Sequence, residues 1–250
     1  MDIRLEDRGR VAVVTIDNQP RRNAMTRDML RDLAGLWDRL ESSDHRCVVI
    51  TGAGDKAFSS GADVGGDLSA APETAAMINR ALLKTHAYPK PIVAAVNGDC
   101  VAGGLELMLS TDIRLAAPHA RFGLPEVRWS IYPFGGATTK LVAQVGYVHA
   151  AELLMTAELI SAETAVAIDL INRIVPAESL IDEALRIADL IAANSPSAVQ
   201  AVKRQLSETL AAHVRAREAA EQALGDAVRA SPHFAEGVAA FLEKRKPDYD

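Results

Sequence analysis

The sequence predicts an α/β protein of 250 residues in which a buried parallel sheet is followed by a purely helical segment. In the first half of the chain, short apolar runs alternate with helical patterns, as they do when helices cover both faces of a parallel sheet. After about residue 195 the sequence is rich in alanine and charge and has no strand pattern. We therefore expect two parts, a large domain of residues 1–195 and a helical module of residues 196–250.

Four apolar runs predict the strands, and in chain order they are residues 11–16, 47–51, 92–96 and 113–117. The first three runs end at clusters of turn-forming residues, as strands commonly do. Because these runs are predominantly apolar rather than alternating, we expect the strands to be buried on both faces.

Two apolar stripes at helical spacing predict the helices that cover the sheet. One stripe begins after Thr26, a suitable N-cap, and extends to Leu40. The other covers residues 180–191 and ends at residues 194–196, where a proline prevents simple continuation of the helix. Between the two helices, the stretch 65–72 is the expected mobile loop.

The C-terminal segment continues with apolar positions at helical spacing over residues 199–228. A last helix is expected to begin at Ser231–Pro232 and to extend through Leu242. Together these helices carry more apolar surface than a short tail needs for itself. This excess favours packing onto other subunits.

Composition and charge narrow the class of protein. Apolar residues make up 49% of the chain and charged residues 24%, as in globular proteins. The net charge of −6 argues against nucleic acid or an anionic membrane as the main partner. The first residues contain no apolar stretch typical of a secretion signal, and no apolar run reaches about 18 residues, so we expect neither secretion nor a membrane span. Its two cysteines, Cys47 and Cys100, lie in apolar surroundings, so we expect a cytoplasmic protein with reduced thiols rather than a disulfide.

Several common catalytic motifs are absent from the sequence. It contains no phosphate-binding loop, no dinucleotide-binding fingerprint and no nucleophile elbow. The six histidines never fall at metal-ligand spacing, so we expect no metal site.

Two glycine-containing segments, residues 57–64 and 96–106, could expose backbone amides to a ligand. In the second segment a buried strand leads through a turn into Gly103–Gly104 at the start of an apolar helix. A helix N-terminus offers unpaired N–H donors, and glycine lets a ligand approach them closely. Two donors from different loops that meet at one point would form an oxyanion hole. Turns and tight helix packing are the alternative explanation for these glycines.

Two carboxylates accompany these segments. Glu106 lies in the first turn of the apolar helix between leucines, and Glu126 follows in an apolar loop. Burial among leucines would raise the pKa of Glu106 towards values that are useful for acid–base catalysis. The alternative is a glutamate that simply complements the helix dipole. Spacing alone does not show that the two carboxylates meet.

Seven short segments spread over almost the whole chain carry a family resemblance. They are residues 20–25, 58–64, 94–106, 111–114, 122–126, 234–237 and 241–245. In their order and spacing they resemble the crotonase superfamily, the enoyl-CoA hydratase/isomerase family. The resemblance implies a crotonase-like spiral of ββα units with a C-terminal helical oligomerisation module that builds trimers, often paired into hexamers. It further implies an acyl-CoA thioester substrate, a role in fatty acid metabolism, and no cofactor beyond the coenzyme A of the substrate.

The same resemblance assigns roles to four residues. The oxyanion amides carry over onto Ala62 and Gly103, and the two glutamates of the family's hydratases carry over onto Glu106 and Glu126. Glu106 would activate a water for attack at C3, and Glu126 would deliver a proton to C2. Retention of both glutamates makes hydration of a 2-enoyl-CoA the leading reaction.

Contacts with coenzyme A are also implied by the resemblance. Residues 62–65 (Ala62, Asp63, Val64 and Gly65) line the family's CoA groove, and Arg22 is a candidate partner of the pyrophosphate. Phe241 and Lys244 match positions that in relatives reach the CoA of a neighbouring subunit. A solvated basic helix end is the alternative explanation for Lys244.

One departure from the family pattern lies close to the expected site. Phe134 stands where the family's hydratases commonly carry a small residue, and Trp129 and Tyr132 add bulk nearby. Two explanations of this aromatic group stay open. The rings either pack in the core or reshape the acyl pocket, and in the second case Phe134 would contact the substrate.

Other activities remain open at this point. They are an enoyl-CoA isomerase, a dehydratase or hydrolase of another acyl-CoA, and a non-catalytic acyl-CoA-binding relative. The acyl chain is not specified, because the stretch between residues 65 and 90 contains no motif.

Overall fold

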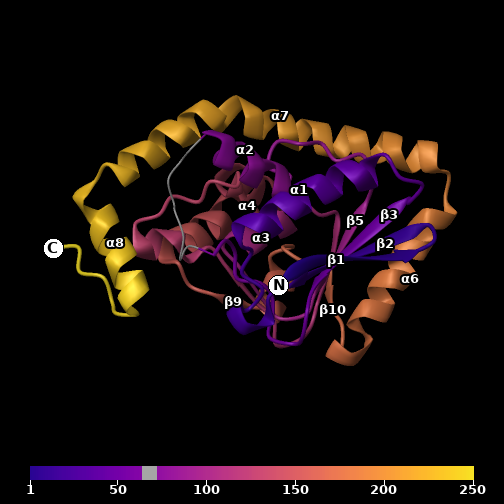
Figure 1. The fold of residues 1–250 in the computed structure, drawn as a ribbon, viewed down its shortest axis with the longest axis horizontal. Coiled ribbons are helices and arrows are strands. Elements are labelled where there is room, and N and C mark those ends of the chain that lie inside the picture. The colour runs from indigo at the N-terminus through magenta and orange to yellow at the C-terminus, as the bar shows by residue number, and fades with distance from the viewer. Residues whose placement is uncertain (64–71) are drawn as a thin grey trace.

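A computed structural model describes residues 1–63 and 72–250, and it contains two β-sheets surrounded by helices (Figure 1). The larger sheet has the strand order β1 (Asp2–Arg8), β2 (Val11–Asp17), β3 (Cys47–Gly52), β5 (Ile92–Val96), β7 (Ile113–Ala116) and β10 (Arg173–Ile174). The smaller sheet has the order β4 (Ala57–Ser59), β6 (Asp99–Val101), β8 (Arg121–Gly123) and β9 (Ile160–Ser161). The larger sheet is parallel except for the β1–β2 pair.

The helices follow in chain order and connect or cover the sheets. The α-helices are α1 (Arg27–Glu41), α2 (Pro72–Ala81), α3 (Gly103–Met108), α4 (Ala137–Thr156), α5 (Ala162–Ala167), α6 (Leu180–Ala193), α7 (Pro196–Arg229) and α8 (Pro232–Glu243). Three short 3-10 helices are η1 (Gln19–Arg21), η2 (Pro125–Trp129) and η3 (Ala177–Ser179). No helix in the described ranges is both long and apolar enough to cross a lipid bilayer.

The chain alternates between the two sheets, and this alternation produces the spiral. A strand of the larger sheet is followed directly by one of the smaller sheet three times, as β3–β4, β5–β6 and β7–β8. A helix follows each pair, and the next pair is laid down parallel to the last. The predicted spiral of ββα units is confirmed.

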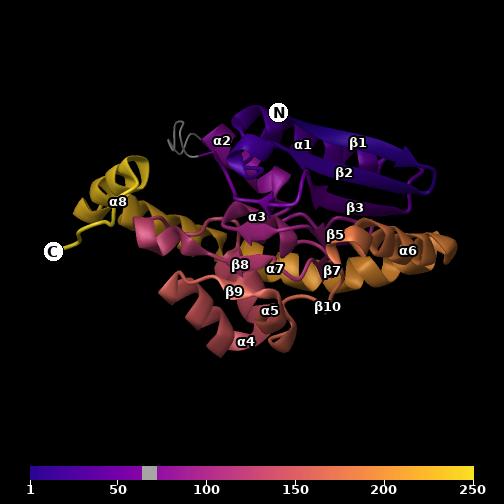
Figure 2. The same ribbon diagram turned by 90° about the horizontal axis from the view of Figure 1, so that it is seen from below.

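The apolar strands of the larger sheet are buried on both faces, as predicted. Alternate residues such as Val13 and Val49 pack under α6, next to Ala184 and Ala188. Residues of opposite parity pack on the other face in a second, larger cluster, which includes the fully buried Trp37 of α1. Figure 1 shows strands of the larger sheet between α1 and α6, and in Figure 2, seen from below, β1 and β2 lie in front of α1.

Local sequence explains where the predicted helices begin. The Thr26 side chain accepts a hydrogen bond from the Met29 N–H, so it caps α1 as expected. Ser231 precedes α8, and Pro232 occupies the first turn, where a missing N–H costs nothing. The expected mobile loop 65–72 lies outside the described residues except for Pro72, which begins α2.

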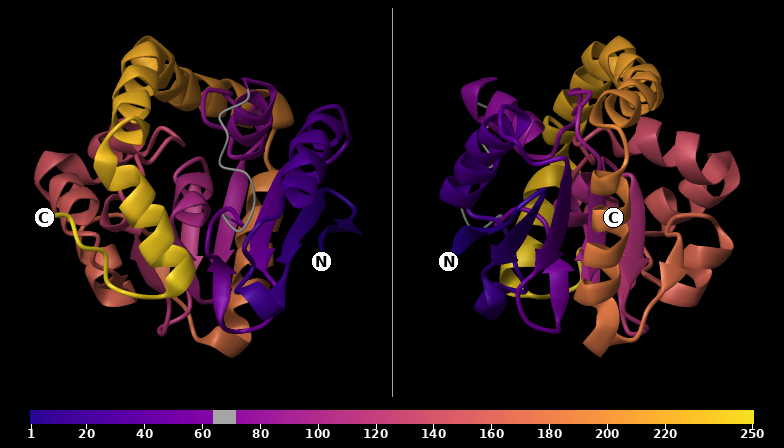
Figure 3. Two further views of the ribbon diagram at one scale, coloured as in Figure 1. Left: turned by 60° about the vertical axis from the view of Figure 1, so that its left-hand side comes forward. Right: turned by 90° about the vertical axis from the view of Figure 1, so that its right-hand side faces the viewer.

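The C-terminal segment forms one long helix and one short one. α7 has 34 residues and lies across the sheets, while α8 turns back from its end (Figure 3). α7 packs on α4, and α8 packs on η2, so both helices contact residues 1–195 of their own chain. The helical character predicted for residues 196–250 is confirmed.

Candidate active site

Two backbone amides converge where β4 and β6 end side by side. The parallel pairing of these strands brings Gly61–Ala62 next to Ala102–Gly103. A methyl group on Gly61, which has a φ of +92°, would lie 2.9 Å from the Gly103 nitrogen. A methyl group on Gly103 would lie 3.5 Å from the Ala62 nitrogen. Glycine at position 61 therefore lets the two backbone segments lie this close, whereas a methyl group on Gly103 would make only ordinary van der Waals contact.

Both of these N–H groups lack an acceptor among the described residues. Met25 donates to Gly61 O and accepts from Asp63 N–H, so the intervening Ala62 N–H points away from that bridge. Gly103 is the first residue of α3, where an N–H has no acceptor within the helix. The preceding Ala102 has a φ of 51°, which is a strained conformation for a residue with a side chain. Two N–H donors without an acceptor in the described part of the chain thus lie on neighbouring backbone segments, which is what an oxyanion hole requires.

Glu106 is buried in the first turn of α3, just behind the Gly103 amide. Its side chain is 5% exposed, and its Oε1 accepts a hydrogen bond of 2.6 Å from the Gly135 N–H. Burial raises the pKa of Glu106 to about 7, against the opposing effects of the Gly135 amide and of Lys140 and Lys84. Desolvation therefore outweighs stabilisation by amides and cations at this carboxyl group.

Gly135 must be glycine for this contact to form in its present geometry. A methyl group there would lie 2.4 Å from Glu106 Cδ and 2.5 Å from its Oε2. The carboxylate thus lies directly against the backbone of the turn that precedes α4.

Glu126, in η2, is the second carboxyl group of the site. Burial, together with the smaller effect of the negative charge of Glu106, raises its pKa to about 8. That electrostatic effect places the two carboxyl groups close enough to titrate as a pair. The structure therefore brings together the two glutamates that the sequence could only place 20 residues apart.

The surroundings of the two glutamates differ in a way that separates their ionisation. Glu106 accepts an amide hydrogen bond and lies near two ammonium groups, all of which favour its ionised form. Glu126 Oε2 is buried and has no hydrogen-bond partner within the described part of the chain, so its charged form is poorly compensated. The first proton lost by the pair is therefore that of Glu106, and Glu126 retains its proton to higher pH.

Two of the predicted CoA-binding residues, Arg22 and Asp63, take part in ion pairs at the surface. Arg22 extends from a left-handed turn, and its guanidinium contacts Asp99 at 3.1 Å. Arg121 binds the same carboxylate at 2.9 and 2.7 Å, so two cations share one anion at this surface. Asp63 accepts two hydrogen bonds from Arg21, while Val64 and Gly65 lie outside the described residues.

The aromatic group near the site contacts the C-terminal helices. The Phe134 ring lies against Gly225 of α7, where an added methyl group would be 1.9 Å from its Cζ, and the Arg229 guanidinium stands 4.3 Å from the ring centre. The Trp129 and Phe241 rings pack edge to face at 5.2 Å. Phe241 thus contacts η2 of its own chain, and Lys244 ends α8 in an exposed left-handed cap.

Several buried charges near the site were not predicted. Lys84 and Glu221 form an ion pair at 3.1 Å, with side chains 5% and 3% exposed. Lys140 donates to Ser110 Oγ and Leu83 O. A weak sequence signal existed, because Lys140 precedes Leu141–Val142 and Glu221 follows Ala219–Ala220, but it did not identify their partners.

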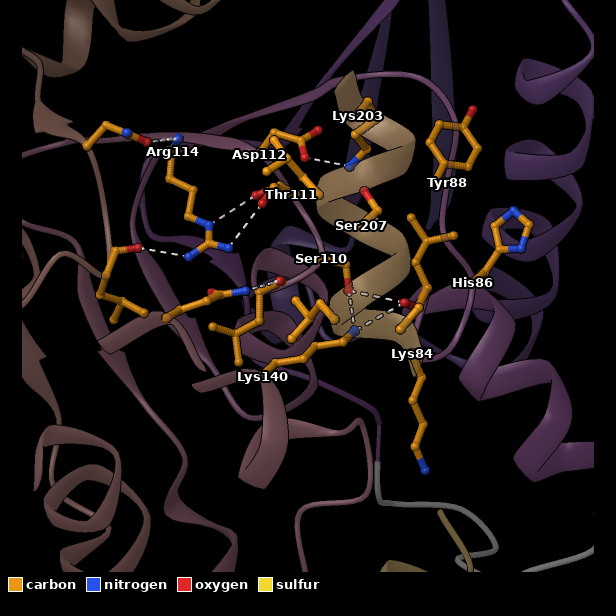
Figure 4. A pocket seen from close by; sticks show the side chains of 18 of the residues that line it. Lys84, His86, Tyr88, Ser110, Thr111, Asp112, Arg114, Lys140, Lys203 and Ser207 are labelled. Atoms are coloured by element: carbon orange, nitrogen blue, oxygen red, sulfur yellow. Dashed lines mark hydrogen bonds and ion pairs between the residues drawn. The ribbon is translucent and has the colours of Figure 1, made fainter. Parts of the chain in front are cut away.

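A cavity of about 330 Å³ lies between the core and α7 (Figure 4). Lys84 and Lys140 line it, whereas the four predicted catalytic residues do not. Among its other charged lining groups, Lys203 pairs with Asp112, and Arg114 donates to Leu170 O. In Figure 4 the side chain of Lys84 extends away from the cluster formed by Ser110 and Lys140.

Comparison with known proteins gives consistent similarities over the whole chain. Residues 6–250 match the enoyl-CoA hydratase/isomerase family. The chain is 37% identical to an enoyl-CoA hydratase of Mycobacterium tuberculosis, over 99% of this chain and 96% of that protein. It is 35% identical to a short-chain-enoyl-CoA hydratase of Clostridium acetobutylicum, over 97% and 95% of the two chains. The fold is similar to the crystal structure of an enoyl-CoA hydratase/isomerase from Pseudoalteromonas atlantica, with a TM-score of 0.90, 29% identity and 99% of each chain covered.

Proposed function

The chain belongs to the enoyl-CoA hydratase/isomerase family, and on that premise we propose that it hydrates 2-enoyl-CoA thioesters with Glu106, Glu126 and the amides of Ala62 and Gly103. Enoyl-CoA hydratase activity and an acyl-CoA thioester substrate agree with relatives that match it over nearly its full length. The observation that carries the residue assignment is the asymmetric glutamate pair beside two unpaired N–H donors.

The two amides would act on the thioester oxygen. When water adds to C3, negative charge develops on this oxygen as the enolate forms. Donors already aimed at that point stabilise the transition state more than the ground state, because they need no reorganisation. Removal of one such donor commonly lowers the rate by about 10²–10³.

The two glutamates would move the protons. Ionised Glu106 takes a proton from water, and the resulting hydroxide forms the new C–O bond at C3. Protonated Glu126 gives its proton to C2, so the elements of water are added across the former double bond. The pair holds one proton before and after the reaction, and in the dehydration direction the roles reverse. The higher pKa of Glu126, which follows from its burial without a partner, supports this assignment of base and acid.

Coenzyme A is proposed to bind near two surface cations that lie far apart in the sequence. Arg22 and Arg121 share the single carboxylate of Asp99, which leaves positive charge at the surface for a phosphate. Ala62 and Asp63 would border the groove, with Val64, Gly65, Phe134, Phe241 and Lys244 completing the proposed binding set. No cofactor other than the coenzyme A of the substrate is included in the proposal.

A homotrimer or homohexamer in the cytoplasm is the proposed state of the protein. Large apolar side chains are more than half exposed on α4, at Tyr147, Val148 and Met155, and on α7, at Val202, Leu206 and Leu224. Exposed apolar surface of this kind supports contact between subunits. The division into a catalytic domain of residues 1–195 and a trimerisation module of residues 196–250 stays part of the proposal.

The test is hydration of crotonyl-CoA, followed by loss of the absorbance of the conjugated thioester. A parallel reaction with a 3-enoyl-CoA separates hydration from isomerisation by its product. The proposal expects 3-hydroxyacyl-CoA from the 2-enoyl substrate. Conversion of the 3-enoyl substrate alone would assign an isomerase, and acyl-CoA binding without turnover of any thioester tested would assign a non-catalytic relative.

A further inference from the structure

Glu221 of α7 is a buried carboxylate that the proposed mechanism does not use. Its side chain is 3% exposed, and the Lys84 ammonium, 5% exposed, lies 3.1 Å from its Oε1. Burying both members of an ion pair has a desolvation cost that their attraction often fails to offset. A stabilising role alone is therefore a weak explanation for this pair.

The Lys84–Glu221 pair lies beside the turn that holds the catalytic base. A methyl group on Gly136 would lie 3.5 Å from Lys84 Cγ and 3.1 Å from Val214 of α7. The preceding amide, Gly135 N–H, donates to Glu106, while the Gly136 amide faces Glu221. Two consecutive amides at the start of α4 thus face carboxylates from two different helices, α3 and α7.

We propose that Glu221 is a positioning residue for catalysis: from the docked α7 it pairs with Lys84 beside the Gly135–Gly136 turn and so sets the surroundings of Glu106. This inference rests on the proposed role of Glu106 as the base for hydration. It gives the C-terminal helix a chemical part in the reaction in addition to its packing.

The charges around Glu106 support this role. From α7, the negative charge of Glu221 raises the pKa of Glu106, and from α4 and the segment before β5, Lys140 and Lys84 lower it. Glu126 of η2 faces Glu106 as the coupled acid. Glu218, 44% exposed and 3.7 Å from Lys84, is the other carboxylate of α7 near this ammonium.

If Glu221 acts in this way, the pKa of Glu106 stays raised only while α7 is docked. With α7 in place, Glu221 offsets the charge of Lys84. Without Glu221, Glu106 faces two buried ammonium groups that are not offset, its pKa falls, and it becomes a weaker base for water. Glu106 would then ionise at lower pH, and the maximal rate of hydration would be lower.

The experiment compares Glu221→Gln, Glu221→Asp and the control Glu208→Gln, which makes the same change at an exposed position of α7. In Glu221→Gln we expect the acid limb of kcat/KM for crotonyl-CoA to move down by at least about half a pH unit, with the basic limb unchanged. Glu221→Asp keeps the charge and should keep the limb, and so should Glu208→Gln. A purely structural role predicts the reverse order, because aspartate shortens the side chain whereas glutamine preserves its shape.

A readout that does not need turnover separates this inference from the proposed function. The carboxyl ¹³C titration of Glu106, assigned by its loss in Glu106→Gln, should shift down in Glu221→Gln by the same amount as the acid limb. If the wild-type protein fails to hydrate crotonyl-CoA, the proposed function fails and this titration still tests the coupling. An unshifted Glu106 midpoint in Glu221→Gln overturns the inference.

A double variant covers the case in which Glu221→Gln alone does not fold. Lys84→Met with Glu221→Gln removes opposite charges together, and its acid limb and ¹³C midpoint should stay within about 0.3 pH unit of the wild type. A larger shift in the double variant contradicts the inferred balance between the two charges.

Discussion

The pH dependence of hydration can be worked out from the glutamate pair. Only the singly protonated pair is competent, because one carboxyl group must be ionised and the other protonated. With pKa values of about 7 and about 8, the pair holds one proton in about 60% of molecules at pH 7.5. At pH 6 and at pH 9 this fraction is about 9%, so kcat/KM should fall about sevenfold on each side of the optimum.

The variant Glu126→Gln tests the assignment of the two limbs. Loss of the general acid should lower kcat by about 10²–10⁴. The residual activity should keep the acid limb, which reports ionisation of Glu106, and lose the basic limb. The assay is the initial rate of crotonyl-CoA hydration between pH 5.5 and pH 9.5. A bell that survives in Glu126→Gln, or a wild-type profile that is flat over this range, would refute the reasoning.

Three further predictions concern substrate binding, stability and packing. Arg22→Ala should raise KM for crotonyl-CoA about three- to tenfold and leave kcat within about twofold, whereas Arg31→Ala, in an exposed pair on α1, should change neither. The folded-state pKa of Glu126 is raised above its ordinary value of about 4.3. The stability contributed by its protonated side chain is therefore fully present below about pH 4.3 and is lost as pH rises through about 8. Glu126→Gln should therefore be about as stable as wild type at pH 4 and roughly 1–3 kcal/mol more stable at pH 9 in urea unfolding, and an equal difference at both pH values would contradict this. Gly225→Ala, whose methyl group would overlap Phe134, should cost about 1–3 kcal/mol in the same assay, while Gly35→Ala, with free space around it, should be neutral or stabilising.

Sequence reasoning located the large strands because their signal is local. Residues 92–96 are all apolar and residues 11–16 are apolar except for Thr15, and this pattern is sufficient for strands buried on both faces. The strands β4, β6 and β8 were not predicted, since three residues are too few to show a period. β1 was also not predicted, because its side chains are mostly exposed and charged and it pairs only with β2.

The site was predictable to the extent that its chemistry is carried by residue type. Glycine at positions 61 and 103 and glutamate at positions 106 and 126 were identified from the sequence, and the fold brings them together. The Lys84–Glu221 pair could not be found in this way, because neither spacing nor motif links residues so far apart in the chain. The ionisation order of the two glutamates also needed the structure, since it depends on the Gly135 amide and on the unpartnered Glu126 Oε2.

The aromatic group at residues 129–134 gains a packing explanation from the structure. Phe134 fills the space that Gly225 leaves on α7, and Trp129 packs on Phe241 of α8. These contacts connect the loop after Glu126 to both C-terminal helices. A reshaped acyl pocket beside Phe134 stays a prediction, which substrate-length series with Phe134→Ala can test.

The central claim, that Glu106 and Glu126 together perform the hydration, is tested most directly by single and double glutamine variants. We predict that Glu106→Gln and Glu126→Gln each lower kcat for crotonyl-CoA by about 10²–10⁴. The double variant should be little slower than the worse single variant, because the two groups act as a unit. Near-normal hydration by either single variant, with its fold intact, would contradict the account.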